Sequence, residues 1–270
     1  MKIGLMWGMM CFVSAVAAFA AAAVSVPVER LEGNNLLIVA GTIEGRECSL
    51  LLDTGATHTT FDLGWVKENL PAVALKDVIV DGTTNVRVVP KSFVAESLRL
   101  GEVDFQGFPV FAVPLGHLSQ AVGRRVDGIL GMNLLGAYDV RISAREGRAV
   151  FSGEAKTPEP VTPKLTLGGV EFLVDTGSTY SFVNAGKWPE GTGEVSLGAT
   201  DVNGTNAIKV RKGLKRTFPL DGTDFEFEPL LVQEDRNFIG ADVLRRYDLV
   251  LTRDGRSPRV VFSPVAQMAH

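Results

Sequence analysis

The chain has 270 residues, a formal net charge of −4 and a sequence pI near 5.5. No basic surface dominates a chain with this charge, which argues against nucleic acid as its main partner. Of its two cysteines, Cys11 lies in an apolar N-terminal run and only Cys48 lies beyond it. One cysteine cannot form an internal disulfide, so a packed core must stabilise the protein, and a small disulfide scaffold is excluded.

Residues 1–24 have the pattern of a secretory signal peptide. Lys2 is the only charged residue before an apolar run, 3–24, that ends in the four alanines 20–23. A basic start, an apolar middle and small residues at the exit are typical of a cleaved signal. We therefore expect cleavage between Ala20 and Ser25 and a periplasmic or secreted mature protein. An uncleaved run would be long enough to anchor the protein in a membrane.

The remainder of the chain has the pattern of short strands, which predicts an all-β fold. Apolar or alternating runs at 36–39, 42–43 and 48–52 predict strands, with a hairpin turn at 44–46. A second hairpin is expected between 78–80 and 86–89. Short helices are expected at 63–69, after Gly131 and after Gly240. Asn133 and Asp242, within these last two segments, could cap the helix N-termini.

Three short patterns occur twice in the same order, which indicates an internal duplication. An apolar run followed by Asp-Thr-Gly stands at 50–55 and at 172–177, and an apolar-apolar-Gly segment stands at 129–131 and at 238–240. Between them, Asp81-Gly82-Thr83-Thr84-Asn85 is matched by Asn203-Gly204-Thr205-Asn206. We therefore expect an N-terminal lobe at 26–152 and a C-terminal lobe at 165–266. The residues between them, 153–164, contain three prolines and have the composition of a stiff linker.

Asp53 and Asp175 end the two repeated apolar runs. A buried strand followed by a glycine that allows a sharp turn presents the aspartate in a largely dry place. Duplication can bring two such carboxyl groups face to face about a pseudo-twofold axis. Two carboxyls in contact cannot both ionise cheaply, so they share one proton. Such a pair can activate a water molecule against a carbonyl group with no metal or other cofactor.

On these motifs the chain resembles the retropepsin-like and pepsin-like aspartic proteases, and looks most like a bacterial secreted form with both halves in one chain. The resemblance covers nearly all of residues 35–263. It implies an all-β, two-lobed acid-protease fold with a pseudo-twofold internal repeat. It also implies an aspartic-type endopeptidase with Asp53 and Asp175 as the catalytic dyad, no cofactor, and a peptide or protein substrate. We expect a monomer that meets a membrane only if the signal stays uncleaved.

The resemblance also implies supporting roles for residues around the dyad. Thr54 and Thr176 would hydrogen-bond across the interface between the halves. The active-site loops would be completed by Gly55, Gly177 and Ser178, and ψ-shaped loops beneath the dyad would contain Gly131 and Gly240. Hairpins over the substrate, the candidate flaps, would contain Asp81, Gly82, Thr83, Asn203 and Gly204. The first hairpin has no tyrosine, which is closer to retropepsins than to pepsin.

One difference between the two motifs predicts unequal carboxyl groups. Ser178 follows the second Asp-Thr-Gly and could donate a hydrogen bond to Asp175, whereas Ala56 follows the first and cannot. Donation stabilises the charged form. We therefore expect Asp175 to carry more of the negative charge and Asp53 more of the proton.

Other conspicuous residues are interpreted as structural. We expect His58 to be a surface histidine and Cys48 a buried small hydrophobe. The three histidines of the chain have no metal-ligand spacing. The pairs Tyr138-Asp139 and Tyr247-Asp248 are expected to be structural, and Arg124-Arg125 to lie in a loop. Whether Trp65, Trp188 and Phe111 belong to the core or to a substrate cleft is left open.

Two other functions are compatible with parts of this pattern. A catalytically silent peptide-binding module could keep the fold, but it has no need for intact Asp-Thr-Gly in both halves. A hydrolase acting on sugars could also use two carboxylates. The Thr-Gly that follows each aspartate favours the protease.

Overall fold

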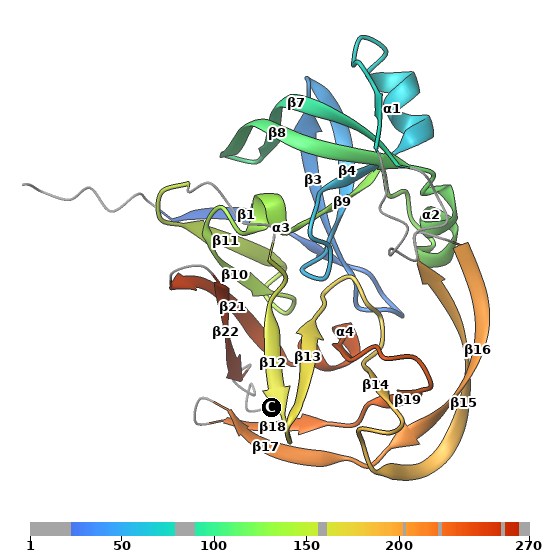
Figure 1. Ribbon diagram of the computed structural model, residues 1–270. Helices are drawn as coiled ribbons and strands as arrows, with labels where there is room; N and C mark the ends of the chain where they lie inside the picture. Colours follow the sequence, from blue (N-terminus) through green and yellow to red (C-terminus); the bar gives the residue numbers. More distant parts are fainter. Residues whose placement is uncertain are drawn as a thin grey trace, which may run out of the picture.

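The computed structural model describes residues 23–78, 90–155, 161–201, 204–220, 223–254 and 257–264. Strands dominate these residues and helices are few and short (Figure 1). Each half of the chain builds one large sheet, and strands of both halves join in a third. The predicted all-β, two-lobed fold with an internal repeat is therefore confirmed. No helix among the described residues is long and apolar enough to cross a membrane.

The first half forms an eight-stranded sheet that closes on itself because β3 pairs with both β4 and β7. In spatial order its strands are β2 (Glu29–Arg30), β3 (Leu37–Ile43), β4 (Arg46–Leu52), β9 (Gly128–Leu130), β5 (Thr60–Asp62), β8 (Val103–Val113), β7 (Lys91–Leu100) and β6 (Lys76–Asp77). Its helices are α1 (Leu63–Asn69), α2 (Gly116–Val122) and α3 (Met132–Leu135).

The second half repeats this strand order without a counterpart of β2. Its seven-stranded sheet runs β12 (Lys164–Leu167), β13 (Val170–Val174), β20 (Phe238–Ile239), β14 (Phe182–Asn184), β19 (Leu230–Val232), β16 (Gly204–Gly213) and β15 (Glu190–Asp201). A separate hairpin, β17 (Arg216–Leu220) with β18 (Thr223–Phe227), and the helix α4 (Ala241–Leu244) complete it. In each half the strand before Asp-Thr-Gly pairs in parallel with the strand before the later Gly.

The second half is shorter because it has no counterpart of α2. In the first half, α2 lies between β8 and β9, whereas β19 leads to β20 through residues 233–237 alone. α2 is an additional helix that the sequence pattern does not predict. The other predicted helices are confirmed, because α1 spans 63–69 and α3 and α4 begin directly after Gly131 and Gly240.

The third sheet joins the halves. Its order is β1 (Val24–Pro27), β11 (Arg148–Ser152), β10 (Asp139–Ser143), β21 (Tyr247–Asp254) and β22 (Ser257–Pro264). Where β10 meets β21, the pairs Val140–Leu251 and Ile142–Leu249 flank the pair Arg141–Val250. Since Val140 and Ile142 are equivalent to Leu249 and Leu251 in the repeat, exchanging the halves maps this pairing onto itself. The pseudo-twofold axis therefore passes between Arg141 and Val250.

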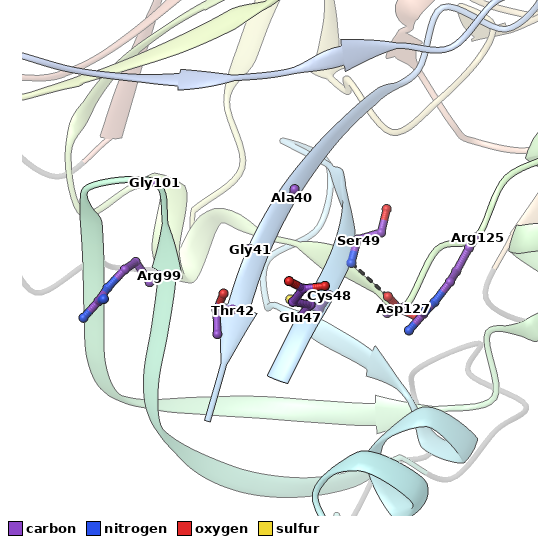
Figure 2. Close-up of a pocket in the computed structure, with 10 residues that line it drawn as sticks. All are labelled: Ala40, Gly41, Thr42, Glu47, Cys48, Ser49, Arg99, Gly101, Arg125 and Asp127. Carbon is purple, nitrogen blue, oxygen red and sulfur yellow. Dashed lines mark hydrogen bonds and ion pairs between the residues drawn. The ribbon is translucent and has the colours of Figure 1, made fainter. Parts of the chain in front are cut away.

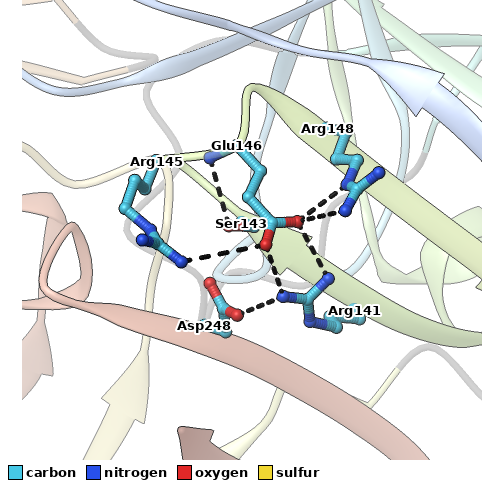
Figure 3. A network of polar contacts seen from close by, with 6 residues as sticks. All are labelled: Arg141, Ser143, Arg145, Glu146, Arg148 and Asp248. Atoms are coloured by element: carbon cyan, nitrogen blue, oxygen red, sulfur yellow. Dashed lines mark hydrogen bonds and ion pairs between the residues drawn. The ribbon is translucent and has the colours of Figure 1, made fainter. Parts of the chain in front are cut away.

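Arg141 also ties the halves together through its side chain (Figure 3). Its guanidinium group donates to Glu146 at 3.0 and 3.1 Å and to the buried Asp248 of the second half. Arg148 donates to the same Glu146 at 2.7 Å. Hydrogen bonds from Arg141 and Arg148 lower the pKa of Glu146 to about 2. The network thus supplements the continuous backbone pairing across the axis, and it explains the structural role of the second Tyr-Asp pair.

Strand β1 lies where the sequence predicts the end of the signal. Val24–Pro27 pairs antiparallel with β11, and the side chain of Val26 is 1 % exposed. Residues 1–22, which contain most of the predicted signal, lie outside the described residues. Residue 24 is therefore part of the folded edge of the sheet that joins the halves.

Of the residues assigned to the candidate flaps, the structure describes only Gly204. Asp81, Gly82, Thr83 and Asn203, assigned to the candidate flaps, lie outside the described residues. Gly204 is the first residue of β16, and the register of β15 and β16 runs without a break from Glu194–Arg211 to Asp201–Gly204. β15 and β16 are therefore paired as a long antiparallel hairpin up to Asp201 and Gly204.

Candidate active site

The two aspartates follow the ends of equivalent strands. β4 is held by the buried side chains of Leu50 and Leu52, and the Asp53 amide then donates to the carbonyl of Leu130 at 3.1 Å. In the second half the Asp175 amide donates to the carbonyl of Ile239 at 2.9 Å. The last three residues of each strand, 50–52 and 172–174, are all apolar, as expected where a parallel strand is buried. Both aspartates leave their sheets at the same point of the repeated fold.

The threonines of the two motifs exchange four hydrogen bonds across the interface. The Thr54 amide donates to Thr176 Oγ1 at 3.0 Å, and the Thr176 amide donates to Thr54 Oγ1 at 3.1 Å. Each hydroxyl in turn donates to a carbonyl of the other half, Thr54 to Val174 at 2.6 Å and Thr176 to Leu52 at 2.8 Å. Both threonines are buried. This exchange fixes the two aspartate loops against each other.

Each carboxyl group is oriented by its own loop. Asp53 Oδ1 accepts the backbone N–H groups of Gly55 at 2.8 Å and Ala56 at 3.0 Å. Asp175 Oδ1 accepts those of Gly177 at 2.9 Å and Ser178 at 3.1 Å. The two sets are equivalent in the repeat. One oxygen of each carboxyl is therefore held by backbone donors, and the other is available to a neighbour.

The glycines of the motifs bring the two carboxyls together. A Cβ atom on Gly55 would lie 2.4 Å from Cγ of Asp175, and one on Gly177 would lie 2.3 Å from Cγ of Asp53. No side chain fits at such distances, so only glycine allows each loop to approach the aspartate of the other half. The two carboxyls are as a result close enough for each to affect the pKa of the other.

Enclosure by protein raises the pKa of both aspartates above the ordinary value of 3.8. For Asp175 the pKa lies well above that value, since the charge of Asp53 adds to the effect of burial. Both side chains nevertheless remain half-buried rather than sealed. A pair in this setting holds one proton between its members and titrates as a unit.

The expected difference between the two carboxyls is not supported by the structure. The hydroxyl of Ser178 donates to the carbonyl of Tyr180 at 2.8 Å rather than to Asp175. Asp53 and Asp175 each accept the same two backbone N–H groups. The prediction that Ser178 supplies Asp175 with an additional donor is wrong, because the hydroxyl closes its own turn.

Gly131 and Gly240 lie beneath the loops, as predicted. A Cβ atom on Gly131 would lie 2.5 Å from the backbone carbonyl carbon of His58. A Cβ atom on Gly240 would lie 2.4 Å from the backbone carbonyl oxygen of Tyr180. These two glycines are themselves the N-cap residues of α3 and α4, with no side-chain cap. The prediction that Asn133 and Asp242 are N-caps is therefore wrong. Instead, the Asn133 side chain accepts a hydrogen bond from the Thr59 hydroxyl, and the Asp242 side chain accepts one from the Ser181 hydroxyl.

The comparisons with known proteins agree with this geometry. Residues 39–134 match the family model described as aspartyl protease. This match confirms the resemblance to the aspartic proteases over that part of the chain. Among solved structures, a retropepsin-like aspartic protease from Rickettsia conorii matches with a TM-score of 0.34 and 15 % identity over 50 % of this chain and 92 % of that chain. No curated protein matches the chain.

Several residues outside the aspartyl protease motifs have structural places. Cys48 is buried, and burial raises the pKa of its thiol to about 12, so it is a small hydrophobe as predicted. Trp65 and Trp188 belong to the core. His58 is half-buried, and its ring centroid lies 4.9 Å from that of the half-buried Phe111. Burial lowers the pKa of His58.

A cavity of about 510 Å³ lies on the outer side of the first half, away from the aspartate loops. Figure 2 shows Arg99 and Arg125 on opposite sides of β3, which carries Gly41, and β4, which carries Cys48. Asp127 in its wall is fully engaged, because it accepts from the Ser49 amide at 2.9 Å and from Arg125 at 2.7 Å. No group of His, Cys, Asp and Glu within the described ranges could hold a metal ion.

The threonine exchange gives a direct stability prediction. Thr54→Val keeps the shape of the side chain but leaves the Val174 carbonyl and the Thr176 amide without partners. We expect this to lower the free energy of unfolding by about 2–6 kcal/mol, since each of the two buried unsatisfied groups costs about 1–3 kcal/mol. Chemical denaturation would measure the loss.

Two controls accompany this variant. Thr54→Ser retains the hydroxyl and should recover most of the stability. Thr192→Val alters an exposed threonine and should change the free energy of unfolding by less than about 0.5 kcal/mol. Equal stability of Thr54→Val and Thr192→Val would show that the exchange does not hold the halves together.

Proposed function

We propose that this protein is an aspartic endopeptidase in which Asp53 and Asp175 activate a water molecule for attack on a peptide carbonyl. The observation that carries the proposal is that each aspartate carboxyl lies directly against the glycine of the opposite motif, so that the two carboxyls affect each other's pKa. A pair of carboxyls that shares one proton contains both a base and an acid at the same place. Peptide hydrolysis requires both.

The proposed reaction uses the shared proton in two steps. In the first step the ionised carboxyl takes a proton from a water molecule, and the water oxygen attacks the carbonyl carbon of the peptide bond. At the same time the protonated carboxyl gives its proton to the carbonyl oxygen. In the second step the carboxyl that now holds the proton gives it to the leaving nitrogen, and the C–N bond breaks. The other carboxyl takes the proton of one hydroxyl of the tetrahedral intermediate as the new carboxyl C=O forms. The dyad ends with one proton, as it began. Asp53 and Asp175 therefore serve as catalysts without a covalent intermediate or a metal ion.

The hairpin β15–β16 supports an extended peptide as the substrate. It belongs to the second half, yet both of its strands contact α2 of the first half, and Figure 1 shows it curving upward to that helix. β15 is an edge strand of the seven-stranded sheet. Edge strands can pair with an extended peptide through backbone hydrogen bonds. We assign this hairpin, with Gly204 near its bend, as the flap of the second half.

A proteolysis assay on an unfolded protein would test the assignment of the dyad. Asp53→Asn and Asp175→Asn should each lower kcat/KM by at least about 100-fold, because each removes a member of the proton-sharing pair. Asp104→Asn is a matched control, since Asp104 is exposed on β8, and it should retain full activity. Cleavage by either dyad variant at the wild-type rate would refute the assignment. No cleavage by the wild type would favour the peptide-binding module.

We also propose that the protein is processed at or before the Ala23–Val24 bond and is released to the periplasm or secreted. Val24 is the first residue of β1 and pairs with Phe151, so cleavage after Val24 would shorten the folded edge of the sheet. The mature protein should begin at Val24 or at one of the alanines just before it. Intact-mass measurement and N-terminal sequencing of the protein from cell fractions would show this. A mature N-terminus beyond Val24, or an intact chain in the membrane fraction, would contradict it.

A further inference from the structure

The two aspartate loops rest on equivalent but chemically different side chains. In the first half, the Thr59 hydroxyl donates to Asn133 Oδ1 at 2.8 Å and accepts the Gly131 amide at 3.1 Å. In the second half, the Ser181 hydroxyl donates to Asp242 Oδ1 at 2.7 Å and accepts the Gly240 amide at 2.9 Å. The second half therefore uses a carboxyl group where the first uses an amide.

These side chains connect directly to the loops that hold the dyad. The backbone N–H of Asn133 donates to the Thr57 carbonyl at 2.9 Å, and the backbone N–H of Asp242 donates to the Thr179 carbonyl at 3.1 Å. Thr57 and Thr179 lie four residues beyond Asp53 and Asp175. Each short helix thus holds its aspartate loop through both backbone and side chain.

The amide and the carboxyl differ in what they can donate. Asn133 Nδ2 donates to the carbonyl of Pro109 at 3.1 Å, which ties its loop to β8. An ionised Asp242 has no donor for an equivalent bond, whereas a protonated one has. The counterpart of the Pro109 carbonyl in the second half can be found from the backbone pairing. The N–H of Phe111 donates to the Thr59 carbonyl, and the N–H of Leu230 donates to the equivalent Ser181 carbonyl. Because Pro109 lies two residues before Phe111, its counterpart is Glu228, two residues before Leu230.

We propose that Asp242 is a positioning residue for Asp175, and that its protonated form completes the support of that loop as Asn133 does for Asp53. The proposal rests on the proposed function of the dyad. Asp242 would not touch the substrate. It would act through Ser181 and the loop at 178–181, and its ionisation would weaken that support.

The surroundings of Asp242 favour the protonated form. Burial raises the pKa of its carboxyl, and the hydrogen bonds from Ser181 and Val243 offset only part of this rise. Arg246, one turn further along, is the cation that acts on it, and Arg246 is itself engaged with Glu226 of β18. From the facing loop the contacting residue, Ser181, is uncharged. Arg245 contacts only the backbone carbonyl of Asp242, at 3.2 Å.

The direction of the pH effect follows from this raised pKa. The folded protein binds the proton of Asp242 more tightly than the unfolded chain does, so its contribution to stability is fully present below the unfolded pKa. That contribution is lost as the pH rises through the folded pKa. Asparagine at this position cannot ionise and would keep the donor at every pH.

Asp242→Asn therefore tests the proposal. Its Tm should equal that of the wild type at pH 4 and exceed it by at least about 2 °C at pH 7. The ratio of its kcat/KM to that of the wild type should rise from about 1 at pH 4 to several-fold at pH 7, as expected for one group that ionises only in the wild type. Asp242→Ala, which has no hydrogen-bonding group, should be less stable and less active at both pH values.

The reciprocal variant is the matched control. Asn133→Asp introduces the same carboxyl beneath Asp53, and it should lose Tm and activity relative to the wild type as the pH rises. A lower Tm for Asp242→Asn than for the wild type at pH 7, or a constant difference at every pH, would overturn the proposal. The Tm measurements do not require activity, so they remain decisive if no proteolysis is found. Inactivity of the wild type with the expected Tm pattern would contradict only the proposed function.

Discussion

The carboxyl groups of Asp53 and Asp175 are held close together in a half-buried site, and the threonines and glycines around them keep them there. Asp53 and Asp175 repel each other when both are ionised, so their approach costs free energy unless they share a proton and are held from outside. The holding comes from Thr54 and Thr176, whose hydroxyl and amide groups exchange four hydrogen bonds. The glycines that follow them leave no Cβ atom in the way. The proposed chemistry and the positioning role of Asp242 both require this contact.

The duplicated fold supports that contact from two sides. Within each half, the aspartate follows a strand whose neighbours are equivalent in both halves. Between the halves, the joining sheet is centred on Arg141 and Val250, so the pseudo-twofold axis is built into the backbone pairing. A single chain therefore supplies an interface that would otherwise require two copies. Because the halves are covalently joined, they can also diverge, and the replacement of an amide at Asn133 by a carboxyl at Asp242 is one such divergence.

Much of this arrangement could be predicted from the sequence because it is local or repeated. The strand before each Asp-Thr-Gly, α1, and the short helices after Gly131 and Gly240 have clear apolar and glycine patterns. β1 was missed because Val24–Pro27 continues an apolar segment that resembles the end of a signal. The roles of Ser178, Asn133 and Asp242 were misassigned because each side chain had more than one partner within reach. Only the folded chain shows that Ser178 closes its turn on Tyr180, and that Asn133 and Asp242 meet Thr59 and Ser181.

We infer that Asp53 and Asp175 form one proton-sharing site. Carbon-13 NMR of protein labelled at the aspartate carboxyl carbons, followed over pH, tests it most directly. We expect one carboxyl of the pair to remain protonated well above the ordinary aspartate pKa of 3.8, and the pKa of the remaining carboxyl to be lower in both Asp53→Asn and Asp175→Asn, because the like charge of the partner is then absent. Two carboxyls that ionise independently near 3.8, with each unaffected by substitution of the other, would contradict the account.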